Sequence, residues 1–328
     1  MTTILESAGY PYCGPFGLST HFHQRLVWLI THKSLMAENM VPYTSPFRKY
    51  PVIFRLRYTC HLTLSPAPRL RVCAVSYLNT TPLVWGMLHG PQHGVFDLLF
   101  RVPSECADLV AAEEADIGII PAFELTRQDL AVVPGVGIAS RGAVRSILLI
   151  SKCPAGRIRT LAGDTSSRTS VALARIVLTR KFGASPNVIP ARPDLDAMLA
   201  HADAALIIGD PALRIDPATL PYQVYDLGRE WTDWTGLPMV FAVWAGRAEV
   251  ITPDVIAAFQ ESWCYGQARI EEIIAAESVS RAFPAELVRR YLTHHIVCQI
   301  GESERAGMDL YLRYARELDD VTFPNAVR

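Results

Sequence analysis

Residues 71–82 read RVCAVSYLNTTP, an apolar run that ends in polar side chains and a proline. Apolar and β-branched residues bounded by Ser, Asn, Thr and Pro are typical of a buried strand that leads into a helix. Pro82 suits the first turn of that helix, where a backbone N–H has no intrahelical partner. Because open α/β sheets bind ligands at the carboxyl ends of their strands, this junction predicts a pocket. An ordinary helix cap is the alternative interpretation.

Strand and helix patterns alternate from residue 71 onward, which indicates an α/β fold. A buried return strand is predicted at 238–245, and helical spacing dominates from 252 onward. The other predicted strands are 71–76, 97–102, 116–120, 131–134, 144–151, 159–163, 187–190, 204–209 and 222–227. This order predicts two lobes that are joined by two crossing strands and enclose a central cleft. Closure of such a clamp can expel water from a bound ligand.

The pattern also predicts the boundaries of the lobes. Lobe 1 is expected to comprise 71–151 together with 239–328, and lobe 2 is expected to comprise 152–238. Residues 1–70 show no sustained period of 2 or 3.6 residues. We therefore expect them to form an N-terminal extension that is poorly ordered.

Composition narrows the class of protein. A chain of 328 residues, 50% hydrophobic and 19% charged, can bury a large core. A net charge of −1 gives no electrostatic footprint for nucleic acid or an anionic membrane. No apolar run approaches the ~18 residues of a transmembrane helix. The seven cysteines lack CxxC spacing, and no export signal is visible, so a cytoplasmic location is expected.

A second polar segment, DTSSRTS at 164–170, lies at the start of an amphipathic helix predicted at 166–182. A helix N-terminus presents free N–H groups and a positive dipole end, which favour an anion. The added hydroxyls can donate to a carboxylate, and Arg168 can pair with one in a bidentate manner. The segment therefore predicts an anion site, with a polar cap on a surface loop as the alternative.

Ser146 is a third candidate, because it shares one face of a predicted strand with Val144 and Leu148. A serine on a buried strand needs a hydrogen-bond partner, which is either the backbone or a ligand.

The turn after the predicted strand at 204–209 is a fourth candidate. Gly209 would let the backbone approach a ligand closely, whereas Asp210 also suits the cap of a helix that begins at Pro211. Further along, Trp231 and Trp234 precede the return strand, where they could line a pocket or pack in the core.

Several common site motifs are absent from the sequence. We find no GxGxxG after the first strand and no GxxxxGK[ST], GxSxG or HExxH, and the Cys and His residues lack metal-site spacing. Dinucleotide, nucleotide, hydrolase and zinc chemistry therefore lose support.

The chain from about 71 to 320 resembles the chorismate dehydratase family of the futalosine route to menaquinone. The resemblance rests on five segments: SYLNTTP (76–82), DIGIIP (116–121), SSRTSV (166–171), GDPAL (209–213) and WTGLPMVF (234–241). It implies a type II periplasmic-binding-protein-like fold that acts in the cytoplasm. It also implies dehydration of chorismate, a dicarboxylate, to 3-[(1-carboxyvinyl)oxy]benzoate, with neither a metal nor an organic cofactor.

By this resemblance, Asn79 and Ser146 occupy the catalytic positions. The residues expected to bind the substrate are Ser76, Tyr77, Thr80, Ser166, Arg168, Thr169, Ser170, Gly209 and Asp210. Loss of the C4 hydroxyl and the C3 proton makes the ring aromatic, but neutral Asn and Ser are poor bases. We therefore predict that the enolpyruvyl carboxylate of the substrate removes the C3 proton, while Asn79 and Ser146 orient it and hydrogen-bond the departing oxygen.

Two other functions stay open at this point. The sister enzyme of the same route, which forms 1,4-dihydroxy-6-naphthoate, should share the fold, although the SYLNT segment favours the dehydratase. A non-catalytic binding protein for a small carboxylate would bind tightly without turnover and would need an export signal. The sequence predicts no nucleic-acid or membrane partner, and it makes no prediction of oligomeric state.

Overall fold

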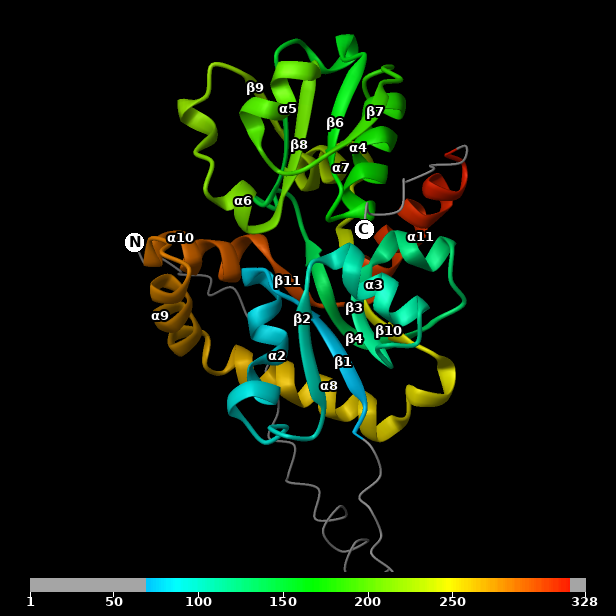
Figure 1. The fold of residues 1–328 in the computed structure, drawn as a ribbon, viewed down its shortest axis with the longest axis vertical. Coiled ribbons are helices and arrows are strands. Elements are labelled where there is room, and N and C mark those ends of the chain that lie inside the picture. The colour runs from blue at the N-terminus through cyan, green and yellow to red at the C-terminus, as the bar shows by residue number, and fades with distance from the viewer. Residues whose placement is uncertain (1–68, 319–328) are drawn as a thin grey trace, which may run out of the picture. The chain divides into compact units, whose positions relative to one another are not determined.

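The computed structural model describes residues 69–318, and every structural statement below refers to these residues. They belong to one compact unit of the chain. The extension expected at 1–70 lies outside them, apart from its last two residues. Two β-sheets, here called sheet A and sheet B, organise this part of the chain, and helices pack against both (Figure 1).

Sheet A has six strands in the order β11-β4-β10-β3-β1-β2. Its strands are β1 (Arg71–Val75), β2 (Asp97–Arg101), β3 (Ile117–Pro121), β4 (Ala131–Ser140), β10 (Met239–Gly246) and β11 (Val297–Gln299). β1 runs parallel to β2 and β3, whereas β10 runs antiparallel to β3 and β4. The predicted strand at 71–76 thus lies inside a mostly parallel region, where both of its faces are covered and four of its five residues are buried.

Sheet B has five strands in the order β7-β6-β8-β5-β9. Its strands are β5 (Ile147–Ser151), β6 (Thr160–Asp164), β7 (Asn187–Ala191), β8 (Ala204–Ile208) and β9 (Gln223–Asp226). β5 pairs antiparallel with β8 and β9. We expected 147–151 in lobe 1, but the strand belongs to sheet B, so the boundary falls within the connection at 141–146. A continuous apolar run indicates that a strand is buried, but it does not indicate which sheet the strand joins.

Each sheet contains one antiparallel strand that the chain supplies by crossing from the other sheet. β5 enters sheet B after the connection at 141–146, and β10 returns to sheet A after the connection at 227–238. The second connection contains a helix, α7 (Leu227–Thr235). Asp226 caps its start, and Gly236 ends it in a left-handed conformation (φ +73°).

Helices cover the faces of both sheets. The remaining α-helices are α2 (Thr81–His89), α3 (Pro103–Ala111), α4 (Arg168–Arg180), α5 (Leu195–His201), α6 (Gly209–Leu213), α8 (Pro253–Gln267), α9 (Ile270–Ser280), α10 (Ala285–Arg290) and α11 (Glu302–Arg316). Short turns include η1 (Leu78–Thr80), η2 (Ala122–Thr126) and η6 (Tyr291–His295), the last a π-helical turn. The region from 252 onward is mainly helical as expected, except for β11.

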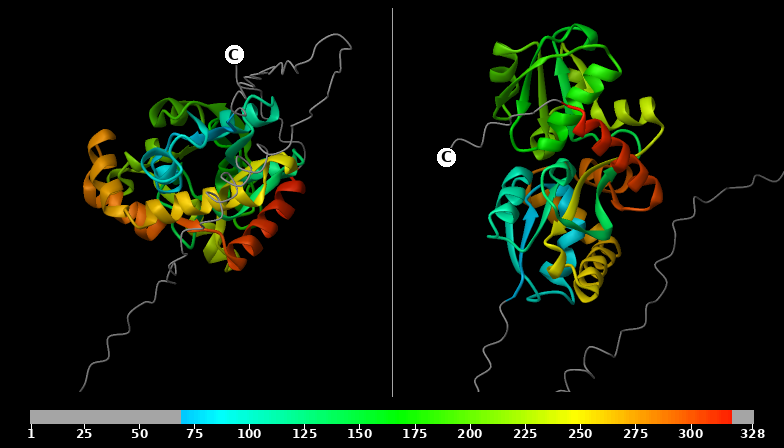
Figure 2. Two further views of the ribbon diagram at one scale, coloured as in Figure 1. Left: turned by 90° about the horizontal axis from the view of Figure 1, so that it is seen from below. Right: turned by 90° about the vertical axis from the view of Figure 1, so that its right-hand side faces the viewer.

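The C-terminal helix α11 contacts elements of both sheets. It packs against β10 and η2 on the side of sheet A and against α4 on the side of sheet B. Figure 2 shows it in red at the level where the two sheets meet. Among the described residues, no helix has both the length and the apolar character needed to cross a bilayer.

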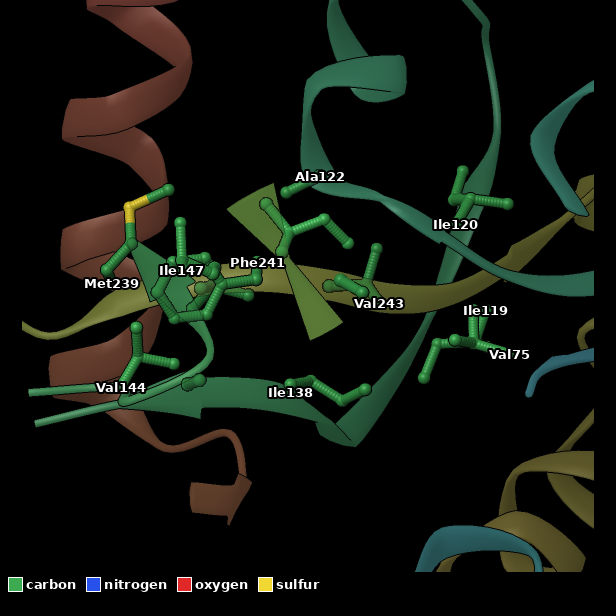
Figure 3. Packing of buried hydrophobic residues seen from close by; sticks show 14 of the residues in the cluster. Val75, Ile119, Ile120, Ala122, Ile138, Val144, Ile147, Met239, Phe241 and Val243 are labelled. Atoms are coloured by element: carbon green, nitrogen blue, oxygen red, sulfur yellow. The ribbon is translucent and has the colours of Figure 1, made fainter. Parts of the chain in front are cut away.

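The core of sheet A lies next to the sheet boundary. Ile119, Ile138, Phe241 and Val243 pack together there, each no more than 7% exposed, and Ile147 of sheet B joins them (Figure 3). Trp231 of α7 is also fully buried, and its Nε1–H donates to the carbonyl of Pro238 (3.1 Å). Of the two interpretations of this indole, packing in the core is the correct one.

Candidate active site

A small cleft lies between the two sheets, where the carboxyl ends of β1 and β3 approach β5, β8 and the start of α4. We call it the intersheet cleft. Its lining residues are Val75, Tyr77, Asn79, Pro103, Pro121, Ile138, Val144, Ser146, Ile147, Ser167, Ser170, Ile208, Gly209, Phe241 and Ala242. A mostly apolar wall with a few convergent polar groups is typical of sites for small molecules.

The two predicted catalytic residues line this same cleft. Asn79 belongs to η1 at the end of β1, and Ser146 directly precedes β5. The hydroxyl of Ser146 accepts a hydrogen bond from Tyr291 (2.8 Å), and its carbonyl accepts one from the N–H of Gly209 (2.8 Å). Thr80 is buried behind Asn79 and donates to its side-chain oxygen (3.4 Å). The fold thus brings together two polar groups from separate sheets.

Tyr77 spans the cleft from sheet A to sheet B. Its hydroxyl donates to Oγ of Ser166 (3.2 Å), and its ring lies against Gly209. Gly209 has φ +66°, and a Cβ atom there would lie 2.6 Å from the Tyr77 ring. Only glycine fits this position, and its close neighbour here is the Tyr77 ring, whereas the sequence analysis expected the backbone to approach a ligand. Burial raises the pKa of Tyr77 to about 12, so its hydroxyl stays protonated at neutral pH.

The polar side chains at the start of α4 have two different roles: some line the cleft, and others bind elements of sheet A. Ser167 caps the helix by accepting the N–H of Ser170 (3.3 Å), and both serines line the cleft. Arg168 pairs instead with Asp108 (2.8 Å) and with Glu124 (3.1 Å).

Thr169 likewise bonds sheet A elements, because its hydroxyl accepts the N–H of Phe123 (3.0 Å). Successive residues of a helix point about 100° apart, so one turn cannot aim every hydroxyl at one ligand. In this structure Arg168 and Thr169 therefore fasten α4 to α3 and η2, and neither lines the cleft.

Asp210 also lies between the sheets and not in the wall of the cleft. Its carboxylate accepts the N–H of Leu78 (2.9 Å) and forms an ion pair with Arg281. Arg281 in turn donates to the carbonyl of Ser76 (2.9 Å), whose own side chain is exposed. Asp210 and Ser76, expected as ligands of the substrate, thus take part in a clamp that joins α6 to the end of β1.

Ser146 is held by an unusual backbone conformation at Arg145. This residue has φ +66°, which costs free energy for a side chain with a Cβ atom. Both oxygens of Asp226 hold it there, since they accept the N–H of Val144 (2.9 Å) and of Arg145 (2.6 Å). The guanidinium of Arg145 donates to the carbonyl of Ile215 (2.6 Å). Strained residues cluster at functional sites, and this one immediately precedes Ser146.

Sequence reasoning missed several residues of this site, above all Tyr291 and Arg145. Tyr291 lies 145 positions from its partner Ser146, and no local motif marks such a contact. The sequence gives no sign of the positive φ at position 145 either, because this position holds arginine and not glycine, the residue that usually adopts such a conformation. Among residues 69–318, no group of three or more His, Cys, Asp or Glu side chains is placed to hold a metal ion.

The sheet order and the cleft between the sheets define the fold of a periplasmic-binding-protein-like α/β protein, and solved structures confirm it. One is a structural-genomics target protein from Archaeoglobus fulgidus (TM-score 0.59, 18% identity, 76% of this chain and 97% of that one). Another is the periplasmic aliphatic sulphonate binding protein of Escherichia coli (TM-score 0.51, 17% identity, 75% and 93%). Identities this low establish the fold alone.

Sequence comparison identifies the family. Residues 70–317 match the family described as menaquinone biosynthesis. The chain is also 30% identical over 253 residues to a protein of Thermus thermophilus named chorismate dehydratase. This alignment covers 72% of this chain and 91% of the Thermus protein. The chain therefore belongs to this menaquinone biosynthesis family, as the resemblance had indicated.

The Tyr77–Gly209 contact leads to a prediction about stability. Gly209→Ala adds both backbone strain and a collision with the Tyr77 ring, so we expect it to lower the free energy of unfolding by about 2–4 kcal/mol. Gly183→Ala is the matched control, because Gly183 has φ +69° but nothing within 4 Å of its Cβ position. It should cost only about 1 kcal/mol. Urea titrations measure both, and equal losses would contradict the close contact.

A buried carboxyl at the end of β6 leads to a second prediction. Asp164 is fully buried; one oxygen accepts the N–H of Ser166 (2.9 Å), and the other has no hydrogen-bond partner among the described residues. Burial raises the pKa of this carboxyl. The folded state therefore binds the proton more tightly than the unfolded state, and stability falls as the pH rises from the ordinary pKa through the raised one.

Asp164→Asn should therefore stabilise the protein at about pH 8 by on the order of 1 kcal/mol, with a smaller gain at about pH 4. Asp203→Asn is the control of opposite sign, because backbone hydrogen bonds from Arg159 and Thr160 lower the pKa of Asp203. It should destabilise at about pH 8 and do so less at about pH 4. Chemical unfolding at both pH values measures the two effects, and the same sign for both variants would refute the assignment.

Proposed function

We propose that this protein is a chorismate dehydratase, a hydro-lyase that eliminates water from chorismate to give 3-[(1-carboxyvinyl)oxy]benzoate. The observation that carries the proposal is the meeting of Asn79 and Ser146 in an enclosed cleft between the two sheets. Membership of the menaquinone biosynthesis family and the dehydratase name of its Thermus relative support the same reaction. The substrate is a small dicarboxylate, and we assign the reaction to the cytoplasm.

One substrate carboxylate binds at the start of α4. The first-turn N–H groups of a helix have no intrahelical partner and carry the positive end of its dipole. The hydroxyls of Ser167 and Ser170, 3.0 Å apart, lie at this position in the cleft wall. Arg168 is engaged by two carboxylates, so hydroxyls and backbone N–H groups replace the bidentate arginine that we had expected.

The lining of the cleft favours a substrate-assisted reaction. No His, Asp, Glu, Lys or Cys side chain is among its described lining residues, and the pKa of Tyr77, about 12, makes that residue a poor base. The enolpyruvyl carboxylate therefore takes the C3 proton, and the electrons of the C3–H bond form the new ring double bond. The C4–O bond breaks, and the departing hydroxide takes up the proton that the enolpyruvyl carboxylate removed, so that one water leaves and the carboxylate is restored. Asn79 and Ser146 orient the carboxylate and stabilise the departing oxygen.

Opening and closing of the sheets controls access to the cleft. The cavity holds about 40 Å³, far below the ~300–1,000 Å³ of typical ligand pockets. Contacts across the boundary hold this closed arrangement, including the bonds of Tyr77 to Ser166, Leu78 to Asp210 and Arg168 to Asp108. Chorismate therefore enters when the sheets part, and their closure excludes bulk water during the reaction.

Turnover of chorismate tests this function. The purified protein should convert chorismate to an aromatic product lighter by one water, detected by mass spectrometry and by its ultraviolet spectrum. Binding of chorismate without product would instead indicate a carboxylate-binding protein. If chorismate is neither bound nor converted, the sister enzyme that forms 1,4-dihydroxy-6-naphthoate becomes the better assignment.

Variants of the two catalytic residues test the mechanism. Asn79→Ala and Ser146→Ala each remove a group that acts on developing charge, so kcat should fall about 100-fold or more while product still binds. Ser140→Ala is the control, because Ser140 is equally buried but bonds the carbonyl of Gly142 outside the cleft lining. Its kcat should match that of the wild type. Near-normal turnover in Asn79→Ala or Ser146→Ala would reject the assigned roles.

A further inference from the structure

A buried tyrosine outside the cleft lining contacts the catalytic serine. Tyr291 is 1% exposed, and its hydroxyl donates a hydrogen bond to Oγ of Ser146 at 2.8 Å. It is not among the residues that line the intersheet cleft; it faces a separate cavity of about 460 Å³ on the other side of Ser146. Any effect of Tyr291 on a ligand in the cleft is therefore transmitted through another residue.

We propose that Tyr291 is a positioning residue for the dehydration, because its hydroxyl fixes Ser146 as a hydrogen-bond donor toward the departing C4 oxygen. This inference rests on the proposed function. A serine hydroxyl carries one proton and two lone pairs. Since Tyr291 occupies a lone pair and no acceptor for the serine proton is found among the described residues, that proton is available to a substrate oxygen.

The direction of the hydrogen bond matters for the reaction. Negative charge develops on the C4 oxygen as the C–O bond breaks, and a donor aimed at that oxygen stabilises it. A chain in which Tyr291 donates to Ser146, and Ser146 donates to the oxygen, polarises every bond in the same sense. Without the tyrosine proton, the serine hydroxyl is a weaker donor and is free to rotate.

The protonation state of Tyr291 suits this role. Burial raises the pKa of its hydroxyl well above the ordinary value, and hydrogen bonding with Ser146 and Asn79 offsets only part of the rise. The hydroxyl therefore remains protonated at neutral pH, and it remains able to donate a hydrogen bond. The same property excludes Tyr291 as the base for the C3 proton.

The backbone around Tyr291 holds the ring in place. Tyr291 begins η6, and π-helical turns are rare and occur frequently at functional sites. At the other end of this turn, Nδ1 of His295 bonds the carbonyl of Ala143, in the connection that carries Ser146 (2.8 Å). The clamp of Asp226 on Arg145 fixes Ser146 from the opposite side. The turn of Tyr291 and the connection that carries Ser146 are thus tied to each other beside the hydrogen bond.

The first test is Tyr291→Phe, which removes one oxygen and keeps the ring. We expect kcat for chorismate to fall at least 10-fold, with KM and product affinity changed less than about threefold, because the lost interaction acts in the transition state. Tyr265→Phe is the control. Tyr265 likewise donates one hydrogen bond through its hydroxyl, but to the carbonyl of His89 (3.0 Å), and it lies on α8 outside both cavities. Its kcat should be unchanged.

A double variant distinguishes action through Ser146 from a general packing effect. If Tyr291 acts only through Ser146, Ser146→Ala/Tyr291→Phe should have the same kcat as Ser146→Ala alone. It removes both hydroxyls of the Tyr291–Ser146 hydrogen bond, so neither is left without the other, and it should fold even where Tyr291→Phe does not. A further loss of kcat in the double variant, or wild-type kcat in Tyr291→Phe, would overturn the proposal. If the wild type itself makes no product, the dehydratase function fails, and that result is separate from either outcome.

Discussion

The carboxylate of Asp226 joins the two connections between the sheets. One oxygen accepts the N–H groups of Val144 (2.9 Å) and Arg229 (3.1 Å), and the other accepts that of Arg145 (2.6 Å). The first connection carries Ser146 into sheet B, and the second begins the return to sheet A. Because one side chain binds both connections, the same three hydrogen bonds hold the two crossings together and fix the backbone next to Ser146. A charged acceptor makes such bonds stronger than neutral ones.

The candidate site places a few neutral polar groups between the two sheets of a periplasmic-binding-protein-like fold. Binding an anion between two sheets needs only backbone N–H groups and hydroxyls, which the start of α4 supplies. The proposed elimination adds a requirement for orientation, because the substrate brings its own base and gains aromaticity. In the proposed mechanism Asn79 and Ser146 provide this orientation from opposite sheets, in the closed arrangement that the structure describes. Catalysis in this fold therefore depends on position more than on strong acids or bases.

Much of the fold follows from local sequence. The segment 71–82 predicted a strand and the helix after it, and both exist as β1 and α2. The pairing of Asn79 with Ser146 at one site came from the family resemblance. What could not be predicted depends on distant contacts: which sheet 147–151 joins, which carboxylates engage Arg168, and the approach of Tyr291 to Ser146. Periodicity identifies a buried face, and it carries no information about the partner that buries it.

The contact between Tyr77 and Gly209 links two motifs that lie far apart in the sequence. The ring fills the space that a side chain at 209 would occupy, so the two positions share one fixed volume at the edge of the cleft. Neither residue can be enlarged without displacing the other, so the pair fixes the width of the cleft at this edge. A smaller side chain than tyrosine at position 77 would leave more room beside Asn79, which lines the same cleft.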